Sequence, residues 1–285
     1  MIRLGTRGSA LAMAQARLVA DALGQDVEIR VVRTRGDASS DALRKMGDGI
    51  FAAALEDALR RGEIDLAVHS LKDLPTDERA GLVVAAVPFR EDSRDVLVAR
   101  DRGGLRSLSS GARVGTSSPR REAQLRELRP DLTFADIRGN VETRMAKVMA
   151  GEHDATLLAL AGLRRLGVAV GDAEILSLDE MLPAPGQGAL AAQCREEDAD
   201  VRARLAAIDD PAVRDATTAE RALLRALGGS CEIALGAFAR VEDGQIVLDA
   251  VLVEGSLVRA RERGLDPVAL GTRAAARLRE PVHAR

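Results

Sequence analysis

Apolar and polar residues follow two different periods along the first two-thirds of the chain. Between residues 10 and 23 the apolar positions recur every three or four residues, which predicts a helix with Ser9 as its N-cap. Shorter apolar runs separate such helical stretches and suit buried strands. The alternation predicts an α/β fold with mostly parallel sheets. Further helices are predicted to begin near Phe51, at Pro119 and after Asn140, and strands at 2–5, 27–32, 66–68, 83–87, 96–99, about 114, 133–137 and 155–159.

The last third of the chain has a different character. Asp210 and Pro211 form a helix start, an N-cap followed by proline at the first helical position, and the helix is predicted to run to about residue 227. Residues 234–240 and 245–253 flank a Glu-Asp-Gly turn, which predicts a hairpin. A final helix is predicted over about 267–279. The pattern predicts a small α+β module.

Composition narrows the classes of protein. The 285 residues are 46% hydrophobic and 30% charged, which suits a globular protein of two or three domains. No apolar run reaches 18 residues and the N-terminus has no apolar signal core, so we expect a cytoplasmic protein without a membrane span. Two cysteines predict neither a disulfide framework nor a metal site. A net charge of −3, with no Trp or Tyr, argues against nucleic-acid binding.

Groups that bind anions gather where predicted strands lead into helices. Free backbone N–H groups at helix starts attract anions, and arginine matches a carboxylate with two parallel hydrogen bonds. Any one such junction is more often ordinary helix capping, but five together favour a cleft for a small molecule with several carboxylates. All five should lie beyond the carboxyl ends of strands. They are GTRGSALA (5–12), VHSLKDLPT (68–76), VGTSSPRR (114–121), IRGNVETR (137–144) and PAPGQGAL (183–190).

These motifs, with GGSCEIALGA near residue 231, occur in the order found in porphobilinogen deaminases, and residues 1–240 resemble that family well. The resemblance implies two lobes like those of periplasmic binding proteins and a small C-terminal α+β domain. It places the first domain at 1–88 and 183–206, the second at 89–182 and the third at 207–285. The change of pattern after Pro88 and near Asp210 agrees with those borders.

The resemblance implies a dipyrromethane cofactor, built from two porphobilinogen units and held by a thioether to Cys231. A thiolate is a good nucleophile toward the electrophilic azafulvene that porphobilinogen becomes on losing ammonia. Gly228 and Gly229 would leave room for the attached pyrrole. Without the family, a lone cysteine is better interpreted as a small buried hydrophobe. That interpretation is kept for Cys194, on an apolar strand.

Asp73 matches the catalytic carboxylate of the family. A carboxylate within hydrogen-bond reach can stabilise positive charge on pyrrole nitrogens and assist proton transfer. Capping of the turn before Leu74 and Pro75 is an equally good account of Asp73 taken alone. Lys72 would help to keep Asp73 ionised.

Further binding residues follow from the same resemblance. Those expected to contact the cofactor are Lys72, Ser70, Thr116, Ser118, Arg120, Arg121 and Arg144. Those expected to contact substrate are Arg7, Ser9, Arg138, Phe51 and Gln187.

The segment from Arg35 to Gly49 would cover the cleft. This chain departs from the family there, because Asp48 stands where a lysine is common, which puts a carboxylate-binding role of the cover in doubt. Ala14 replaces an aromatic residue of some members, and Ser230 and Ala234 replace a glycine and a proline. None of these three touches the inferred chemistry.

The implied activity is a transferase reaction of tetrapyrrole biosynthesis. Four porphobilinogen molecules are joined head to tail into hydroxymethylbilane with release of ammonia. The resemblance implies a monomer that could hand its product to uroporphyrinogen-III synthase. Two rivals are a solute receptor, which would normally carry a signal peptide and need no third domain, and the sensing part of a regulator, which would need a DNA-binding segment. An inactive relative is a third, although every catalytic position named here is filled.

Overall fold

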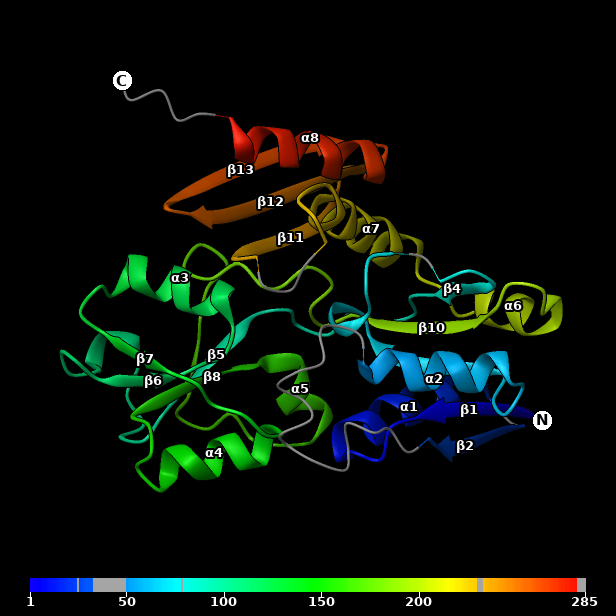
Figure 1. Ribbon diagram of the computed structural model, residues 1–285, viewed down its shortest axis with the longest axis horizontal. Helices are drawn as coiled ribbons and strands as arrows, with labels where there is room; N and C mark the ends of the chain where they lie inside the picture. The colour runs from blue at the N-terminus through cyan, green and yellow to red at the C-terminus, as the bar shows by residue number, and fades with distance from the viewer. Residues whose placement is uncertain (25, 33–49, 78, 230–232, 281–285) are drawn as a thin grey trace.

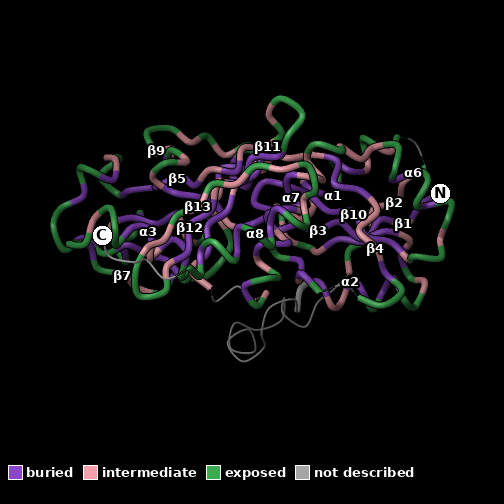
Figure 2. Tube along the Cα trace, turned by 90° about the horizontal axis from the view of Figure 1, so that it is seen from above, coloured by how far each residue is buried: buried purple, intermediate pink, exposed green. Residues whose placement is uncertain are grey.

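The computed structural model describes residues 1–24, 26–32, 50–77, 79–229 and 233–280, except for the side chains of Ile50 and Phe51. Three sheets, each with its own helices, make up this part of the chain (Figure 1). In Figure 1 the first lobe lies on the right, the second on the left and the third unit above both. Buried positions follow the strands through the interior (Figure 2).

The first lobe is built on a five-stranded sheet of order β2-β1-β3-β10-β4. Helices α1 (Ala10–Leu23) and α6 (Ala199–Ala206) contribute to one apolar cluster with the sheet, and α2 (Ile50–Arg60) contributes to two others. The strands are β1 (Ile2–Thr6), β2 (Val27–Val31), β3 (Leu66–Ser70), β4 (Leu82–Ala86) and β10 (Leu190–Arg195).

The second lobe repeats the plan with a sheet of order β7-β6-β8-β5-β9. Helix α3 (Pro119–Leu128) packs in one core cluster, whereas α4 (Val141–Met149) and α5 (Leu160–Arg165) pack in another. The strands are β5 (Asp95–Ala99), β6 (Arg113–Gly115), β7 (Thr133–Ala135), β8 (Ala155–Ala159) and β9 (Glu174–Ile175).

The C-terminal unit is an antiparallel sheet packed against two helices, α7 (Pro211–Ala226) and α8 (Pro267–Arg279). Strands β11 (Leu235–Glu242) and β12 (Gln245–Glu254) form the predicted hairpin, and Asp243 and Gly244 both have positive φ in its turn. A third strand, β13 (Ser256–Gly264), was not predicted and pairs with β12 along its whole length.

The predicted fold class is confirmed, but the parallel share of the sheets was overestimated. Each five-stranded sheet has two parallel and two antiparallel pairings. In the first lobe the difference comes from β10, which returns from the second lobe and runs antiparallel between β3 and β4. The domain borders given above stay predictions.

A buried carboxylate joins the three units where the chain crosses between them. Glu220, on α7, has no exposed surface and pairs with Arg90 at 2.8 Å. It also accepts hydrogen bonds from the backbone N–H groups of Gly186 and Ala239, each at 2.6 Å. Arg90 and Ala189, on the two crossing segments, form a β-bridge. One side chain of the third unit therefore ties together both crossings.

We expect the first lobe to lose stability in acid through Asp65. Hydrogen bonds from Arg3 and then Arg195 lower the pKa of Asp65 to about 2. The unfolded value is about 4, so the carboxylate stabilises the fold above pH 4, and this contribution disappears as the pH falls toward 2. Asp65→Asn should lower the melting temperature at pH 7 and have much less effect near pH 2. Thermal unfolding at both pH values checks this, with Asp57→Asn on an exposed pair as control. An equal loss at both pH values would contradict it.

Candidate active site

The segment with the sequence HSLKDLPT leaves the end of β3 as a single short 3-10 helix, η3 (Leu71–Asp73). Leu71, its first residue, and Leu74, the residue after it, are buried and fix the turn in the apolar core. Asp73 is exposed at its end. Ser70 accepts a hydrogen bond from Gln15 at 2.8 Å, so its hydroxyl braces α1 against β3. Local packing thus presents the Asp73 carboxylate to solvent from a firmly anchored turn.

Lys72 connects this turn to the second lobe. Its Nζ donates to Gln187 Oε1 at 3.3 Å. Burial lowers the pKa of Lys72, and the nearby carboxylate of Asp73 opposes that shift. Arg121 adds a positive charge that lowers the same pKa further. The charges of both lobes therefore act on one ammonium group.

Gln187 lies on the segment that returns from the second lobe, and its amide is fully used. It is 1% exposed, and Nε2 donates to Asp95 Oδ1 at 2.9 Å and to the Ser93 carbonyl at 2.7 Å. With Lys72 on Oε1, the amide links the first lobe to β5 of the second. The side chain predicted to bind substrate therefore serves as a bridge between the crossings in this structure.

Asp95 is a buried partner that the sequence analysis did not predict. It has no exposed surface and accepts from Arg120 and Arg121, each at 2.7 Å. Burial alone would raise the pKa of Asp95, but the two guanidinium charges hold it well below its usual range. The three side chains form an ion-pair triad that needs all its members, because a buried charge without a partner is very costly.

Arg120 and Arg121 were predicted to hold cofactor carboxylates, and both are occupied within the protein. Arg120 also donates to the Leu182 carbonyl, and Arg121 to the Leu157 carbonyl. The Nε atom of each is buried and has no hydrogen-bond acceptor among the described residues. Binding of a ligand by these two arginines stays a prediction. A bound carboxylate would have to share their guanidinium groups with Asp95.

Three predicted hydroxyls form local hydrogen bonds at helix starts. Ser9 Oγ accepts from the Ala12 N–H and caps α1. Ser118 Oγ caps α3, and Thr116 Oγ1 accepts from the Ser118 N–H at 3.1 Å. This is the ordinary capping that the sequence analysis kept as an alternative, so ligand contacts by these hydroxyls stay predictions.

Other predicted arginines lie around the same place. Arg144 donates to the Gly139 carbonyl at 2.9 Å. Burial lowers its pKa, as do Arg121 and Arg138, whereas Asp73 opposes the shift. The charge of Arg144 in the second lobe thus interacts with the carboxylate of the first. The Arg138 side chain is 57% exposed and lies 3.9 Å from Asp136. Arg7, which follows β1, is half-buried.

All five anion-binding motifs reach the expected sheet edges, the fifth by another route. Four of them follow the carboxyl ends of β1, β3, β6 and β7. The motif at 183–190 does not follow a strand but leads into the amino end of β10. The prediction that it lies beyond the carboxyl end of its own strand was therefore wrong. Because β10 is antiparallel to β3, Leu190 pairs with Ser70, so the motif still lies beside the end of β3.

Several predicted residues lie outside the described part of the chain. These are Cys231, its neighbour Ser230, and the segment 35–49 with Asp48; the side chain of Phe51 is not described either. The turn before Cys231 is nevertheless placed. A Cβ added to Gly229 would lie 2.9 Å from Thr76 Oγ1. The turn therefore rests against the segment that carries Asp73.

Arg165 is another cation at the lobe junction that sequence reasoning missed. It donates to the Gly188 carbonyl at 2.5 Å, and burial lowers its pKa to about 10. It is the last residue of α5, a short helix that was not predicted, and no motif marks it. Its contact with the crossing segment appears only in the folded chain.

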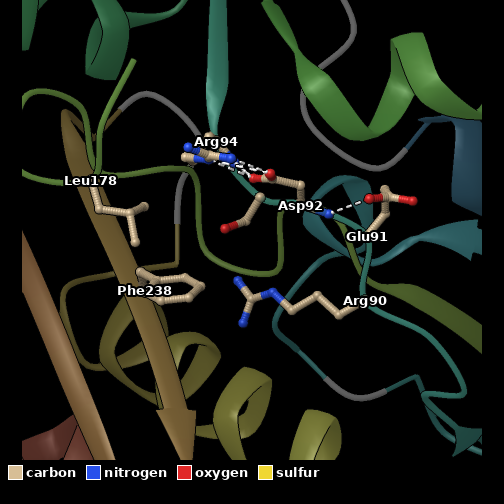
Figure 3. Close-up of a pocket in the computed structure, with 7 residues that line it drawn as sticks. Arg90, Glu91, Asp92, Arg94, Leu178 and Phe238 are labelled. Carbon is tan, nitrogen blue, oxygen red and sulfur yellow. Dashed lines mark hydrogen bonds and ion pairs between the residues drawn. The ribbon is translucent and has the colours of Figure 1, made fainter. Parts of the chain in front are cut away.

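A separate hollow of about 240 Å³ lies beside the crossing segment 90–94 (Figure 3). Its charged side chains all have partners: Arg94 pairs with Asp92, Arg90 with the buried Glu220, and Glu91 with Arg164. Arg90 also lies 4.9 Å from the ring of Phe238. None of the predicted site residues lines it, so we assign it to the junction between units rather than to the active site. The lining residues are Arg90, Glu91, Asp92, Ser93, Arg94, Leu178 and Phe238.

Two further searches concern only the residues that the structure describes. Among them, no three His, Cys, Asp or Glu side chains are grouped so that they could hold a metal ion. None of their helices is both long and apolar enough to cross a membrane.

The geometry defines a class: a two-lobed α/β protein with basic side chains around one exposed carboxylate, and a small third unit that leads a turn to the same place. Sequence comparison gives the family. A model described as porphobilinogen deaminase, dipyromethane cofactor binding domain, matches residues 2–203, and the porphobilinogen deaminase C-terminal domain matches residues 215–280. The chain belongs to the porphobilinogen deaminase family.

Named relatives agree with that assignment. The chain is 51% identical to the porphobilinogen deaminase of Nocardia farcinica, over 90% of this chain and 78% of the relative. It is 53% identical to porphobilinogen deaminase 1 of Streptomyces coelicolor, over 86% and 80%. For the porphobilinogen deaminase of a Roseiflexus species the identity is 47%, over 94% and 92%.

Solved structures similar to the chain include binding proteins of transport systems. One is a probable amino-acid ABC transporter extracellular-binding protein from Bacillus subtilis, at 12% identity and a TM-score of 0.45 over 73% of this chain and 89% of that one. Another is a periplasmic His/Glu/Gln/Arg/opine family-binding protein from Silicibacter pomeroyi, at 16% identity and a TM-score of 0.40 over 73% and 88%.

Proposed function

We propose that this chain is a transferase that joins four porphobilinogen molecules head to tail into hydroxymethylbilane, releasing one ammonia for each bond formed. The observation that carries the proposal is the exposed Asp73 carboxylate on its anchored turn, with Lys72 next to it in sequence and with Arg144 of the other lobe in electrostatic interaction with it. Porphobilinogen carries two carboxylates, which basic side chains can bind. Its ring becomes positively charged when the aminomethyl group leaves as ammonia, and a nearby carboxylate can stabilise that charge.

The residues suit a covalent dipyrromethane. Gly229, two residues before the expected attachment point Cys231, lies against Thr76 of the segment that carries Asp73. In this proposal Arg7, Arg138 and Arg144 bind the acetate and propionate groups of the dipyrromethane, and the electrostatic interaction of Arg144 with both Arg138 and Asp73 supports the role of the last two arginines. When bound, the dipyrromethane supplies the free α-carbon to which the first substrate is joined.

In this proposal Asp73 acts on the reacting pyrrole. Loss of ammonia from porphobilinogen leaves a positive charge shared with the ring nitrogen, and a carboxylate held near that N–H stabilises it. A new carbon–carbon bond then forms at the exocyclic carbon, and the α-proton of the attacked ring is released. In this proposal Asp73 accepts that proton and returns it to solvent. Water finally releases the four-ring product from the protein-bound pyrroles.

Intact mass measurement tests the proposal. The purified protein should exceed its polypeptide mass by two linked pyrrole units, and Cys231→Ser should not. Cys194→Ser is the matched control, because burial in β10 raises the pKa of that thiol to about 11 and makes it a poor nucleophile. If the preparation has the bare mass, porphobilinogen is added and the mass measured again. Absence of an adduct even then would refute the proposal.

The wider setting is proposed on the same basis. We expect a cytoplasmic monomer whose product could pass to uroporphyrinogen-III synthase. Sedimentation of the purified protein alone tests the monomeric state, and sedimentation of its mixture with that synthase tests whether the two proteins associate.

A further inference from the structure

Two arginines on α7 hold the segment that carries Asp73. Arg221 donates from Nη1 to the Leu74 carbonyl at 2.8 Å and from Nη2 to the Pro75 carbonyl at 2.6 Å. Arg225, one turn further along the helix, donates from Nε to the Thr76 carbonyl at 3.1 Å. The acceptors are backbone oxygens in each case, so the helix fixes the backbone of this segment rather than any of its side chains.

These two cations are not placed there by ion pairing with the described residues. Within that part of the chain, neither guanidinium lies in a salt bridge with a carboxylate. Burial and, to a lesser extent, the neighbouring charge of Arg225 lower the pKa of Arg221 to about 10. Removing a guanidinium from water costs free energy that carbonyl dipoles must offset. The fit between the arginine fork and the two carbonyls is what holds Arg221 in position.

The grip extends to both sides of Asp73. Arg221 Nη1 also lies 3.4 Å from the Leu71 carbonyl, which precedes Asp73, while Leu74 and Pro75 follow it. The Leu74 N–H donates back to the Leu71 carbonyl at 3.2 Å and closes the turn. One side chain from the third unit therefore contacts the turn before and after the carboxylate.

The same helix leads to the proposed attachment point. Helix α7 ends at Ala226, and two glycines with positive φ follow before the turn to Cys231. At Gly229 this turn meets Thr76, whose carbonyl Arg225 holds. Both the segment with Asp73 and the start of the turn are therefore held in place by the same helix, α7.

We infer that Arg221 is a positioning residue for Asp73. It fixes the Asp73 carboxylate relative to α7 and to Gly229 just beyond that helix, so that the carboxylate keeps its alignment with the reacting ring. The inference rests on the proposed function and adds to it a residue that touches neither substrate nor cofactor. It assigns Arg221 to the turnover step rather than to substrate capture.

Arg221→Lys tests the inference, because lysine keeps the charge but cannot bridge two carbonyls with a planar fork. A displacement of about 1 Å at a reacting group lowers rates roughly 100-fold, so we expect kcat to fall by about 10- to 100-fold. The KM for porphobilinogen should change far less, and the mass excess of two pyrroles should remain. Hydrogen exchange of the backbone N–H groups in residues 71–77 should become faster.

Arg214→Lys is the matched control. Arg214 lies on the same helix and donates to the Val84 and Ala85 carbonyls, but these belong to β4 and not to the catalytic turn. Its replacement should lower the melting temperature while kcat and exchange at 71–77 stay near wild type. If Arg221→Lys does not fold, Arg225→Lys replaces it, with a smaller expected loss because Arg225 contacts one carbonyl.

The outcomes separate the inference from the proposed function. Unchanged kcat in folded Arg221→Lys, or a loss matched by Arg214→Lys at equal melting temperature, overturns the positioning role. A loss confined to KM does the same, since it would assign Arg221 to substrate capture. Failure of the wild-type protein to carry or acquire pyrroles refutes the proposed function instead, and the exchange comparison at 71–77 still reports whether the arginine holds the turn.

Discussion

Asp73→Ala is expected to abolish turnover while the dipyrromethane stays attached to the protein. The Asp73 side chain is exposed and the turn is held by Leu71, Leu74 and Arg221, so the fold should survive the change. The variant would lose both the charge that stabilises the cationic pyrrole and the group that accepts its proton. Each such contribution is typically worth about 10²- to 10³-fold or more in rate, so we expect kcat to fall at least about 10³-fold.

Steady-state rates together with intact mass measurement check this expectation. Asp73→Asn keeps the shape and removes the charge, so it should resemble the alanine variant. Asp77→Ala is the control, since Asp77 is also exposed and close in sequence. Normal turnover in Asp73→Ala would show that the mechanism is wrong. Loss of the covalent mass excess would instead assign Asp73 to cofactor assembly.

Asp95→Asn is expected to cause the largest loss of stability among single changes at the lobe junction. An amide cannot neutralise Arg120 and Arg121, whose side chains are 5% and 9% exposed. Removing one partner from a buried ion pair typically costs about 3–5 kcal/mol in the free energy of unfolding. Gln187 would also lose the carboxylate that its amide now contacts at 2.9 Å. The variant should therefore unfold at a clearly lower urea concentration.

Asp92→Asn is the appropriate comparison. Asp92 lies on the same crossing segment and pairs with Arg94, but that arginine side chain is 38% exposed. Pairs of this kind contribute less than about 1 kcal/mol. Equal unfolding midpoints for Asp95→Asn and the wild-type protein would mean that the triad contributes little to the stability of the junction.

The features that sequence could predict are those set by neighbouring residues. The helix starts at Ser9, Ser118, Asn140 and Asp210 are confirmed, and each side chain accepts a hydrogen bond from a backbone N–H two or three residues on. The hairpin at Asp243 and Gly244 is of the same kind. Because these signals depend on local backbone geometry, a single sequence carries them completely.

Other features depend on partners that are distant in sequence. The strand β13 was missed because Arg259, Arg261 and Arg263 make it look like a solvated loop, although these exposed arginines pair with β12 and alternate with less exposed residues. The helices α5 and α6 are short and carry little apolar pattern. No local rule indicates such elements, since tertiary packing stabilises them.

Distance in sequence also concealed part of the site. The sequence predicted the positive charges at the lobe junction, but not that Asp95 holds Arg120 and Arg121 from 25 and 26 positions away. The hydrogen bonds from Arg221 to the Leu74 and Pro75 carbonyls could not be predicted either, because every residue has a backbone carbonyl and the sequence does not mark which ones accept. A sequence shows how many charged side chains a site can have, but only the folded structure shows which of them pair with each other.

The place of β10 in the first sheet has a consequence for how the protein is made. Strand β4 pairs only with β10 among the described strands, and residues 87–189, which include the whole second sheet, are synthesised between them. Until β10 has been synthesised, the edges of β3 and β4 that pair with it have unpaired backbone N–H and C=O groups. Unpaired strand edges of this kind promote aggregation. The second lobe has all its strands before the first one does. A chain released before residue 190 would leave the Asp73 turn on an unfinished sheet.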